Sequence, residues 1–201
     1  ITKSINPDDI HRPRTRLVAL ENTMNKGGGS IYDFKEIIKI ATVCKKNKLK
    51  LHLDGARLFN ALAESKETPS DYGTHFDTIS ICFSKGLGAP VGSVLIGTKN
   101  VINKGKRIRK ALGGGMRQAG YLAAACTYAL DHHLDKIKDD HRRARILASS
   151  IENLPFVSEI YPVRTNIIII ALKPDRSPQI FLQKLEKKGL TMKSGVECEY
   201  F

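Results

Sequence analysis

The chain has no tryptophan, and only 6% of its 201 residues are aromatic. Proteins that bind single-stranded nucleic acid stack the bases on aromatic rings. The most basic segment, residues 99–110, contains no aromatic residue at all. We therefore attribute the net charge of +13 to a solvated helix face and to sites for an anionic cofactor or substrate. A nucleic-acid binder, whose affinity would fall steeply with salt, ranks last among the alternatives.

Long apolar runs and paired cysteines are also missing. The most apolar run covers residues 167–172, whereas a membrane span needs about 20 residues, so we expect no membrane segment. No CxxC spacing occurs, and the histidines at 132, 133 and 141 lack a matching acidic or cysteine set, so we predict no metal site. The pattern favours a reduced, cytoplasmic protein with buried thiols. The cysteines are Cys44, Cys82, Cys126 and Cys198.

Apolar runs of strand length alternate along the chain with segments of helical periodicity. The predicted strands are 16–21, 49–53, 76–83, 92–96, 157–160 and 167–172. The predicted helices are 33–48, 57–63, 99–112, 118–130, 137–154 and 177–188, and the Ala-rich helix 118–130 is expected to be buried. This order predicts an α/β fold with a mostly parallel sheet. We expect residues 1–135 to be part of a large sheet domain, and residues 136–201 to be a linking helix and an incomplete, smaller C-terminal α/β domain.

Asp54 and Lys85 follow two of the predicted strands. Asp54 closes the run Leu51–Leu53, and Lys85 follows the run Ile79–Phe83 and precedes a glycine-rich turn. Ligands bind at the carboxyl ends of strands in open α/β sheets. A lysine and a carboxylate together indicate pyridoxal phosphate, because the lysine forms a Schiff base and the carboxylate keeps the pyridine nitrogen protonated. The plainer interpretation is a surface lysine and a buried aspartate that caps the next helix.

Three further cations are candidates for the same site. Arg57 lies near the start of the helix after Asp54, where a guanidinium can hold a ring oxygen, a carboxylate or Asp54 itself. Lys110 and Arg117 flank a glycine run next to a helix start, which favours anion binding. A simple helix break with two solvated cations explains that pair equally well. We expect His52, on the same strand face as Asp54, to be structural.

Several ordered runs resemble the L-threonine aldolase family, whose members are fold-type-I pyridoxal-phosphate enzymes with the aspartate aminotransferase architecture. The resemblance extends from about residue 8 to about residue 172. The runs are Asp9-Ile10-His11, Arg14-Thr15-Arg16-Leu17, Leu20-Glu21-Asn22-Thr23, His52-Leu53-Asp54-Gly55-Ala56-Arg57, Ser84-Lys85-Gly86-Leu87-Gly88-Ala89-Pro90-Val91-Gly92-Ser93 and Gly113-Gly114-Gly115-Met116-Arg117-Gln118.

This resemblance implies cleavage of L-threonine or L-allo-threonine to glycine and acetaldehyde by a homotetramer. It implies that Lys85 forms the internal aldimine, that Asp54 pairs with the pyridine nitrogen and that Arg57 contacts the ring oxygen. Arg117 and Lys110 match basic residues on the phosphate side, in part across a subunit contact. His11 matches a family histidine, and either a histidine such as His11 or an ordered water is the catalytic base.

The chain departs from the family in three places. Met24 stands where the family usually has a histidine. In the family, the N-terminal third supplies a loop that cradles the phosphate and a histidine that stacks on the ring, and neither precedes Ile1. The family's C-terminal arginine, which binds the substrate carboxylate, is also missing. Residues 195–201 do not resemble the surroundings of that arginine. We expect a fragment with little or no aldolase activity by itself. Two alternatives stay open: an inactive truncated gene product, and a β-eliminating lyase on the same fold.

Overall fold

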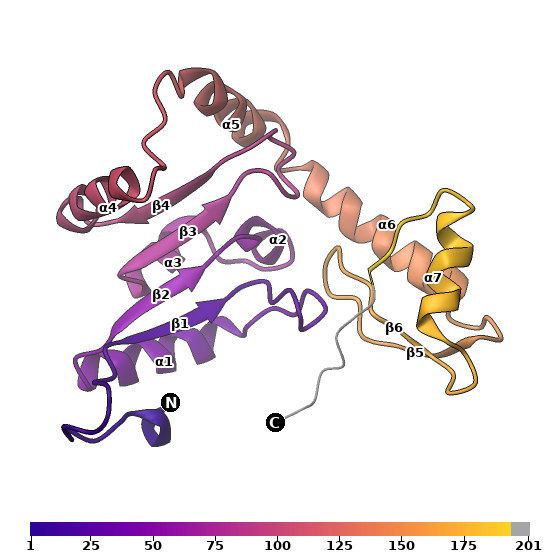
Figure 1. Ribbon diagram of the computed structural model, residues 1–201, viewed down its shortest axis with the longest axis horizontal. Coiled ribbons are helices and arrows are strands. Elements are labelled where there is room, and N and C mark those ends of the chain that lie inside the picture. Colours follow the sequence, from indigo (N-terminus) through magenta and orange to yellow (C-terminus); the bar gives the residue numbers. More distant parts are fainter. Residues whose placement is uncertain (194–201) are drawn as a thin grey trace. The chain divides into compact units, whose positions relative to one another are not determined.

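The computed structural model describes residues 1–193 (Figure 1). These residues form two compact units. The first contains residues 1–23 and 31–138, and the second contains residues 24–30 and the described chain from residue 139 onward. Cys198 and the segment 195–201, which the sequence analysis discussed, lie outside the described residues.

A four-stranded sheet with the strand order β1-β2-β3-β4 forms the centre of the first unit. Strands β1 to β3 are parallel and β4 is antiparallel to β3, which confirms the predicted mostly parallel α/β sheet. All four strands fall on or near predicted ranges. They are β1 (Leu17–Glu21), β2 (Lys50–Asp54), β3 (Thr78–Cys82) and β4 (Ser93–Gly97).

Five α-helices and one short 3-10 turn complete the first unit. These are η1 (Thr2–Ser4), α1 (Phe34–Lys46), α2 (Leu58–Ala63), α3 (Pro69–His75), α4 (Lys99–Ala111) and α5 (Gly120–His132). Helix α3 was not among the predicted helices, although its start carries a clear signal. The Thr68 hydroxyl accepts from the backbone N–H of Asp71, the Asp71 side chain accepts from the N–H of Thr68, and Pro69 is the first helical residue, so α3 begins with a capping box.

Burial alternates along the central strand as period-2 geometry requires. Leu51 and Leu53 are buried, whereas His52 is half-buried and Asp54 is exposed. Helix α1 packs against β2 and against α3, and the rings of Phe34 and Tyr72 are 5.1 Å apart. Part of the apolar core of the first unit therefore lies between one sheet face and these two helices (Figure 1). The same core continues to α2 and α5, through Leu58 and Ala129.

The burial prediction for the Ala-rich helix is wrong in the described chain. In α5 only Ala129 is buried, and the Tyr121 side chain is 90% exposed. Strand β4 is also exposed along its whole length. Apolar composition alone predicted burial, whereas within residues 1–193 most of α5 and all of β4 are exposed or half-buried.

The second unit contains a two-stranded antiparallel sheet. The Phe156 and Phe181 rings, 5.1 Å apart, pack its last helix against the chain before β5. Its elements are α6 (Lys136–Ile151), which begins in the first unit, β5 (Val157–Ile160), β6 (Ile170–Leu172) and α7 (Pro178–Glu186). The predicted strand 167–172 is shortened to Ile170–Leu172. The residues before it lie beside the turn 24–30, since a Cβ on Gly29 would lie 3.5 Å from Cβ of Ile167. In the same segment, Thr165 Oγ1 donates to the Gly29 carbonyl at 2.9 Å.

Candidate active site

Asp54 ends β2 at the carboxyl edge of the parallel strands. It pairs in register with Ser80 on β3, its carbonyl accepts from the N–H of Asn22 at 3.0 Å, and the N–H of Gly55 donates to the Ser80 carbonyl at 2.8 Å. The backbone of Asp54 is thus fixed from both neighbouring strands. Its side chain is exposed, so the expectation of a buried carboxylate is wrong, and the carboxylate is open to a ligand.

The turn after Asp54 leads directly into α2. Oδ1 of Asp54 accepts from the N–H of Ala56 at 3.0 Å, whereas Arg57 occupies the N-cap position of a helix that begins at Leu58. The interpretation of Asp54 as the helix cap is therefore wrong by position, because its carboxylate stabilises the preceding turn. Arg57 is half-buried, three residues along the chain from Asp54.

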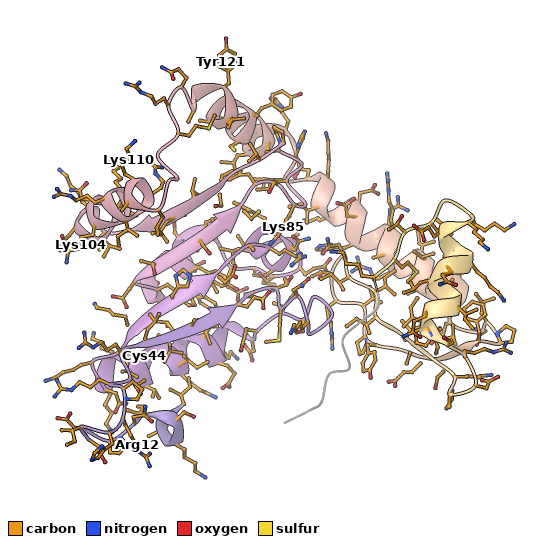
Figure 2. All side chains as sticks on the ribbon, viewed as in Figure 1. Arg12, Cys44, Lys85, Lys104, Lys110 and Tyr121 are labelled. Carbon is orange, nitrogen blue, oxygen red and sulfur yellow. The ribbon has the colours of Figure 1, made fainter. Side chains whose placement is uncertain are left out.

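Lys85 follows β3 in a tight turn whose two sides are anchored. The N–H of Gly88 donates to the Lys85 carbonyl at 2.8 Å, and the N–H of Ala89 donates to the Phe83 carbonyl at 3.0 Å. Gly88 has a φ of 71°, which favours glycine. Leu87 and Ala89 are buried, whereas Lys85 is exposed. The turn therefore holds Lys85 at the carboxyl end of β3, where Figure 2 labels it.

Helix α2 and the Lys85 turn pack against each other through Asn60. The Asn60 side chain is 3% exposed, and its Oδ1 is 3.5 Å from the position that a Cβ on Gly86 would take. The N–H of Asn60 donates to the Arg57 carbonyl at 3.0 Å. Asn60 was not among the predicted site residues, although it is a polar residue inside an otherwise apolar helix. Asp54 and Lys85 thus lie at the carboxyl edge of the sheet, as their positions after two strands predicted, and Arg57 precedes α2 as expected.

Lys110 and Arg117 lie elsewhere in the chain. Both are exposed, Lys110 near the end of α4 and Arg117 in the loop before α5. The Lys110 side chain folds over the glycine run, so that a Cβ on Gly115 would lie 2.5 Å from its Cδ. Figure 2 shows Lys110 well apart from Lys85. A single chain does not bring these two cations to Lys85, so their role at the phosphate side stays a prediction.

His11 is also not brought to the carboxyl edge. It lies in the exposed loop before β1, where its N–H donates to Asp9 Oδ1 at 2.8 Å. Strand β1 runs from Leu17 toward Glu21, which pairs with Asp54, so His11 precedes the opposite end of the strand. Its neighbour Arg12 is labelled there in Figure 2. Its catalytic role stays a prediction that one chain does not support.

His52 and the cysteines take structural positions. Nδ1 of His52 is 2.8 Å from Thr78 Oγ1 on the neighbouring strand. Cys44 is buried, and Cys82 and Cys126 are half-buried. Burial raises the pKa of the Cys44 thiol, and the negative charge of Asp77 acts in the same direction. Among residues 1–193, no cluster of three or more His, Cys, Asp and Glu side chains could hold a metal ion. In the same range, no helix is long and apolar enough to cross a membrane.

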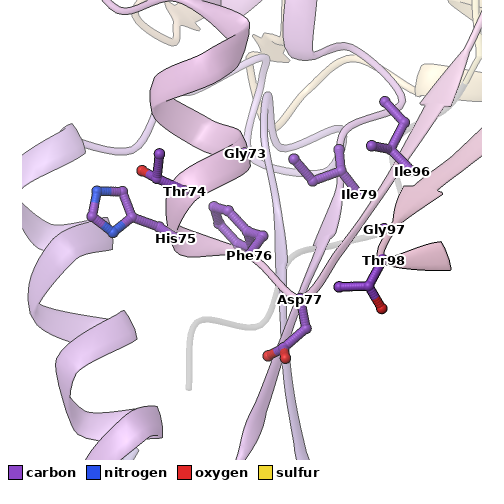
Figure 3. A pocket seen from close by; sticks show the side chains of 9 residues that line it. All are labelled: Gly73, Thr74, His75, Phe76, Asp77, Ile79, Ile96, Gly97 and Thr98. Carbon is purple, nitrogen blue, oxygen red and sulfur yellow. The ribbon is translucent and has the colours of Figure 1, made fainter. Parts of the chain in front are cut away.

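A hollow of about 480 Å³ lies at the opposite edge of the sheet, beside the amino end of β3 (Figure 3). Its one carboxylate is already engaged, because Asp77 accepts from Lys50 Nζ at 2.8 Å and from the N–H of Leu51 at 2.9 Å. Desolvation raises the pKa of Asp77, but these bonds outweigh it and the net pKa is lowered. The lining residues are Gly73, Thr74, His75, Phe76, Asp77, Ile79, Ile96, Gly97 and Thr98. Asp54 and Lys85 do not line it.

The donor set at the carboxyl edge fits pyridoxal phosphate. An amine that can bond to an aldehyde and a carboxylate that can hold a protonated ring nitrogen lie at the ends of neighbouring strands. Both side chains are exposed, and within the described residues neither makes an ion pair. The backbone is tight beside Asp54, since a Cβ on Gly55 would lie 2.8 Å from the Ser80 carbonyl oxygen. The backbone therefore leaves no room for a side chain at Gly55, and the exposed side chains of Asp54 and Lys85 are open to a ligand.

This arrangement is the fold of fold-type-I pyridoxal-phosphate enzymes. The structure of a threonine aldolase from Leishmania major superposes with a TM-score of 0.74 over 89% of this chain and 51% of that chain, at 23% identity. The family model described as beta-eliminating lyase matches residues 1–174. The chain belongs to this beta-eliminating lyase family.

Curated relatives agree with that assignment. Low-specificity L-threonine aldolase 1 of Arabidopsis thaliana is 38% identical over 91% of this chain and 52% of its own length. The low specificity L-threonine aldolase of Escherichia coli O157:H7 is 42% identical over 75% of this chain and 44% of its own length. The chain thus spans about half the length of the curated relatives it matches.

Proposed function

We propose that the protein that contains this chain cleaves L-threonine and L-allo-threonine to glycine and acetaldehyde with pyridoxal phosphate. The observation that carries this proposal is the placement of Asp54 and Lys85 at the carboxyl ends of neighbouring parallel strands. The identity to low-specificity L-threonine aldolases supports the choice of substrate.

Each group at the edge has a defined task in this reaction. Pyridoxal phosphate, when bound, supplies an electron sink for the electron pair of the broken Cα–Cβ bond. Lys85 would hold the cofactor through its amine. The Asp54 carboxylate would keep the proton on the ring nitrogen, and the Arg57 guanidinium would bind the ring oxygen.

The remaining tasks fall to groups that this chain does not bring to Lys85. We propose that Arg117 and Lys110 bind the phosphate side, in part from a neighbouring subunit of a homotetramer, and that the enzyme is cytoplasmic. A histidine, for which His11 is the candidate, or an ordered water removes the β-hydroxyl proton. In the whole protein, residues 1–135 belong to the large cofactor domain, and residues 136–201 form the linking helix and the start of the smaller domain.

A β-eliminating lyase is the second candidate, because the matching family model carries that description. The same lysine and carboxylate serve both reactions, since both reactions begin with the amino acid bound through its amine. The products separate them: retro-aldol cleavage gives glycine and an aldehyde, whereas β-elimination gives a keto acid and ammonia.

The test uses the whole protein that carries this chain, incubated with pyridoxal phosphate and L-threonine, with all four products measured. We expect glycine and acetaldehyde in equal amounts. Lys85→Ala should abolish both the products and the visible absorbance band of the bound cofactor. Lys104→Ala, which removes an exposed lysine from α4, is the matched control and should retain both.

Keto acid and ammonia in place of glycine would overturn the aldolase assignment and establish the lyase. A visible band that survives in Lys85→Ala would overturn the role of Lys85. The isolated 201-residue chain should show little or no glycine release. If it turns over as fast as the whole protein, the expectation of a fragment is wrong; if the whole protein gives no product either, the inactive alternative holds.

A further inference from the structure

The imidazole of His133 contacts the turn that carries Lys85. Its Nδ1 is 2.6 Å from the carbonyl oxygen of Leu87. A carbonyl oxygen only accepts hydrogen bonds, so Nδ1 must carry the proton and donate it. In the sequence, His133 had been considered only as a metal ligand.

The Leu87 carbonyl is held in place by the conformation and burial of the turn. Leu87 is 3% exposed and Ala89 is 7% exposed, and Gly88 between them has a φ of 71°. A Cβ on Gly88 would lie 3.4 Å from Nδ1 of His133. The buried side chains of Leu87 and Ala89 thus anchor the turn, and the imidazole at the end of α5 contacts it.

His133 is itself fixed by the backbone. It is the C-cap of α5, where its N–H donates to the Ala129 carbonyl at 2.9 Å, and its carbonyl accepts from the N–H of Lys136 at 3.1 Å. The Tyr128 ring meets the imidazole edge-on, with the centroids 5.6 Å apart. The backbone of His133 is thus held at the end of α5, and its imidazole contacts both Leu87 and the Tyr128 ring.

A second contact from α5 reaches the same loop further along. The Cys126 thiol lies 3.6 Å from the Val91 carbonyl, and a Cβ on Gly92 would lie 3.2 Å from its Sγ. Cys126 precedes His133 by about two helical turns, so both project from one face of α5. One face of this helix therefore follows the loop from Leu87 to Gly92.

We propose that His133 is a positioning residue for Lys85. Its hydrogen bond to the Leu87 carbonyl fixes the turn after Lys85 and thereby holds the backbone from which the amine reaches the cofactor. The inference rests on the proposed function only for the role of Lys85. The hydrogen bond itself should be detectable in the protein without any cofactor, through amide exchange in the turn.

Three variants separate the hydrogen bond from simple packing. In His133→Asn the side-chain amide nitrogen takes the place of Nδ1 and can still donate to Leu87. In His133→Gln the amide nitrogen lies where Nε2 would be, and in His133→Leu no donor remains. The control is His132→Leu, because His132 is exposed and its ring contacts that of Tyr128 in a tilted arrangement, with the centroids 4.3 Å apart.

The first measurement is amide hydrogen exchange of the whole protein without cofactor. We expect exchange at the amides of Gly88 and Ala89 to be roughly 2- to 10-fold faster in His133→Gln and His133→Leu, the range that corresponds to one lost hydrogen bond. His133→Asn and His132→Leu should match the parent. If the amides of Gly88 and Ala89 exchanged at the same rate in His133→Asn and His133→Leu, whether slowly or fast, the proposal would be overturned.

The second measurement is made with pyridoxal phosphate bound. The pH midpoint of the visible absorbance band should shift in His133→Gln and His133→Leu and stay in place in His133→Asn. An unchanged midpoint in all three would overturn the positioning role. If Lys85→Ala retains the visible band, the proposed role of Lys85 is wrong. The exchange rates then still decide separately whether His133 holds the turn.

Discussion

The side-chain amide of Asn22 donates a hydrogen bond to the phenolic oxygen of Tyr72 at 3.0 Å, and both residues are fully buried. Asn22 follows β1 and also donates its N–H to the Asp54 carbonyl at 3.0 Å, while its Oδ1 accepts from the N–H of Tyr32 at 3.4 Å. A tyrosine on α3 is thereby linked, through one asparagine, to the backbone of the candidate cofactor-binding aspartate.

Replacing Tyr72 by Phe should destabilise the protein. The substitution leaves Asn22 Nδ2 buried without its acceptor, which costs about 1–3 kcal/mol. The free energy of unfolding from urea denaturation measures the effect. Tyr121→Phe, at a side chain that is 90% exposed, is the control and should change nothing. Equal stability of both variants would contradict the importance of the buried bond.

The same tyrosine makes stability depend on alkaline pH. Desolvation raises the pKa of Tyr72 to about 12, above the value near 10 of a tyrosine in an unfolded chain. A raised pKa stabilises the fold fully below pH 10, and this contribution is lost as the pH rises toward 12. The free energy of unfolding should fall more steeply between pH 10 and 12 in the parent than in Tyr72→Phe. Parallel curves would show that Tyr72 ionises equally in both states.

Gly29 should not tolerate a side chain. It has a φ of 74°, and a Cβ there would collide with Thr165 Oγ1, the group that donates to the Gly29 carbonyl. Gly29→Ala should lower the free energy of unfolding by about 1–3 kcal/mol or more. Gly120→Ala is the matched control, because no atom lies within 4 Å of its Cβ position. It begins α5, so alanine should leave stability unchanged or improve it slightly.

Much of the sheet was predictable from local pattern. Alternating or continuous apolar runs located all four strands of the first unit, and the rule that parallel strands share a carboxyl edge placed Asp54 and Lys85 together. Helix α3 was also predictable, since Thr68, Pro69 and Asp71 form a start signal that the sequence analysis did not use. These features depend on residues close in the chain, which is why sequence alone contains them.

Long-range packing was not predictable. The burial of Asn60 and the contact of His133 with Leu87 depend on where α2 and α5 pack, and no spacing rule encodes that. The bond from Thr165 to the Gly29 carbonyl joins residues more than a hundred positions apart, and no local pattern indicates it. The exposure of Asp54 was misjudged for the same reason, because an apolar strand end gave no information on what covers it.

Removing the Asp77 carboxylate should destabilise the amino edge of the sheet. Asp77→Ala leaves the N–H of the buried Leu51 without its acceptor, which costs about 1–3 kcal/mol, whereas the exposed ion pair to Lys50 contributes only about 0–1 kcal/mol. Lys50→Ala, which removes only the ion pair, should therefore cost less. Because the pKa of Asp77 is lowered, its stabilisation is present above the ordinary carboxyl pKa and is lost as the pH falls. Equal losses in the free energy of unfolding for Asp77→Ala and Lys50→Ala would contradict the larger contribution of the bond to Leu51.

Neutralising Asp54 should weaken the site without unfolding the sheet. The backbone of Asp54 holds the two neighbouring strands, whereas its exposed carboxylate makes one bond within residues 1–193, to the N–H of Ala56, and an asparagine side-chain oxygen can still accept it. Asp54→Asn should therefore keep the thermal midpoint of the protein without cofactor nearly unchanged. The affinity for pyridoxal phosphate should fall on the order of 10- to 100-fold, since a hydrogen bond to a charged group contributes about 1.5–3 kcal/mol. Glu159→Gln, which neutralises an exposed carboxylate on β5, should leave the affinity unchanged. If Asp54→Asn bound the cofactor as tightly as the parent, the carboxylate would not be the partner of the ring nitrogen. Of the two strand-end groups, Lys85 would then be the one left with a role in cofactor binding.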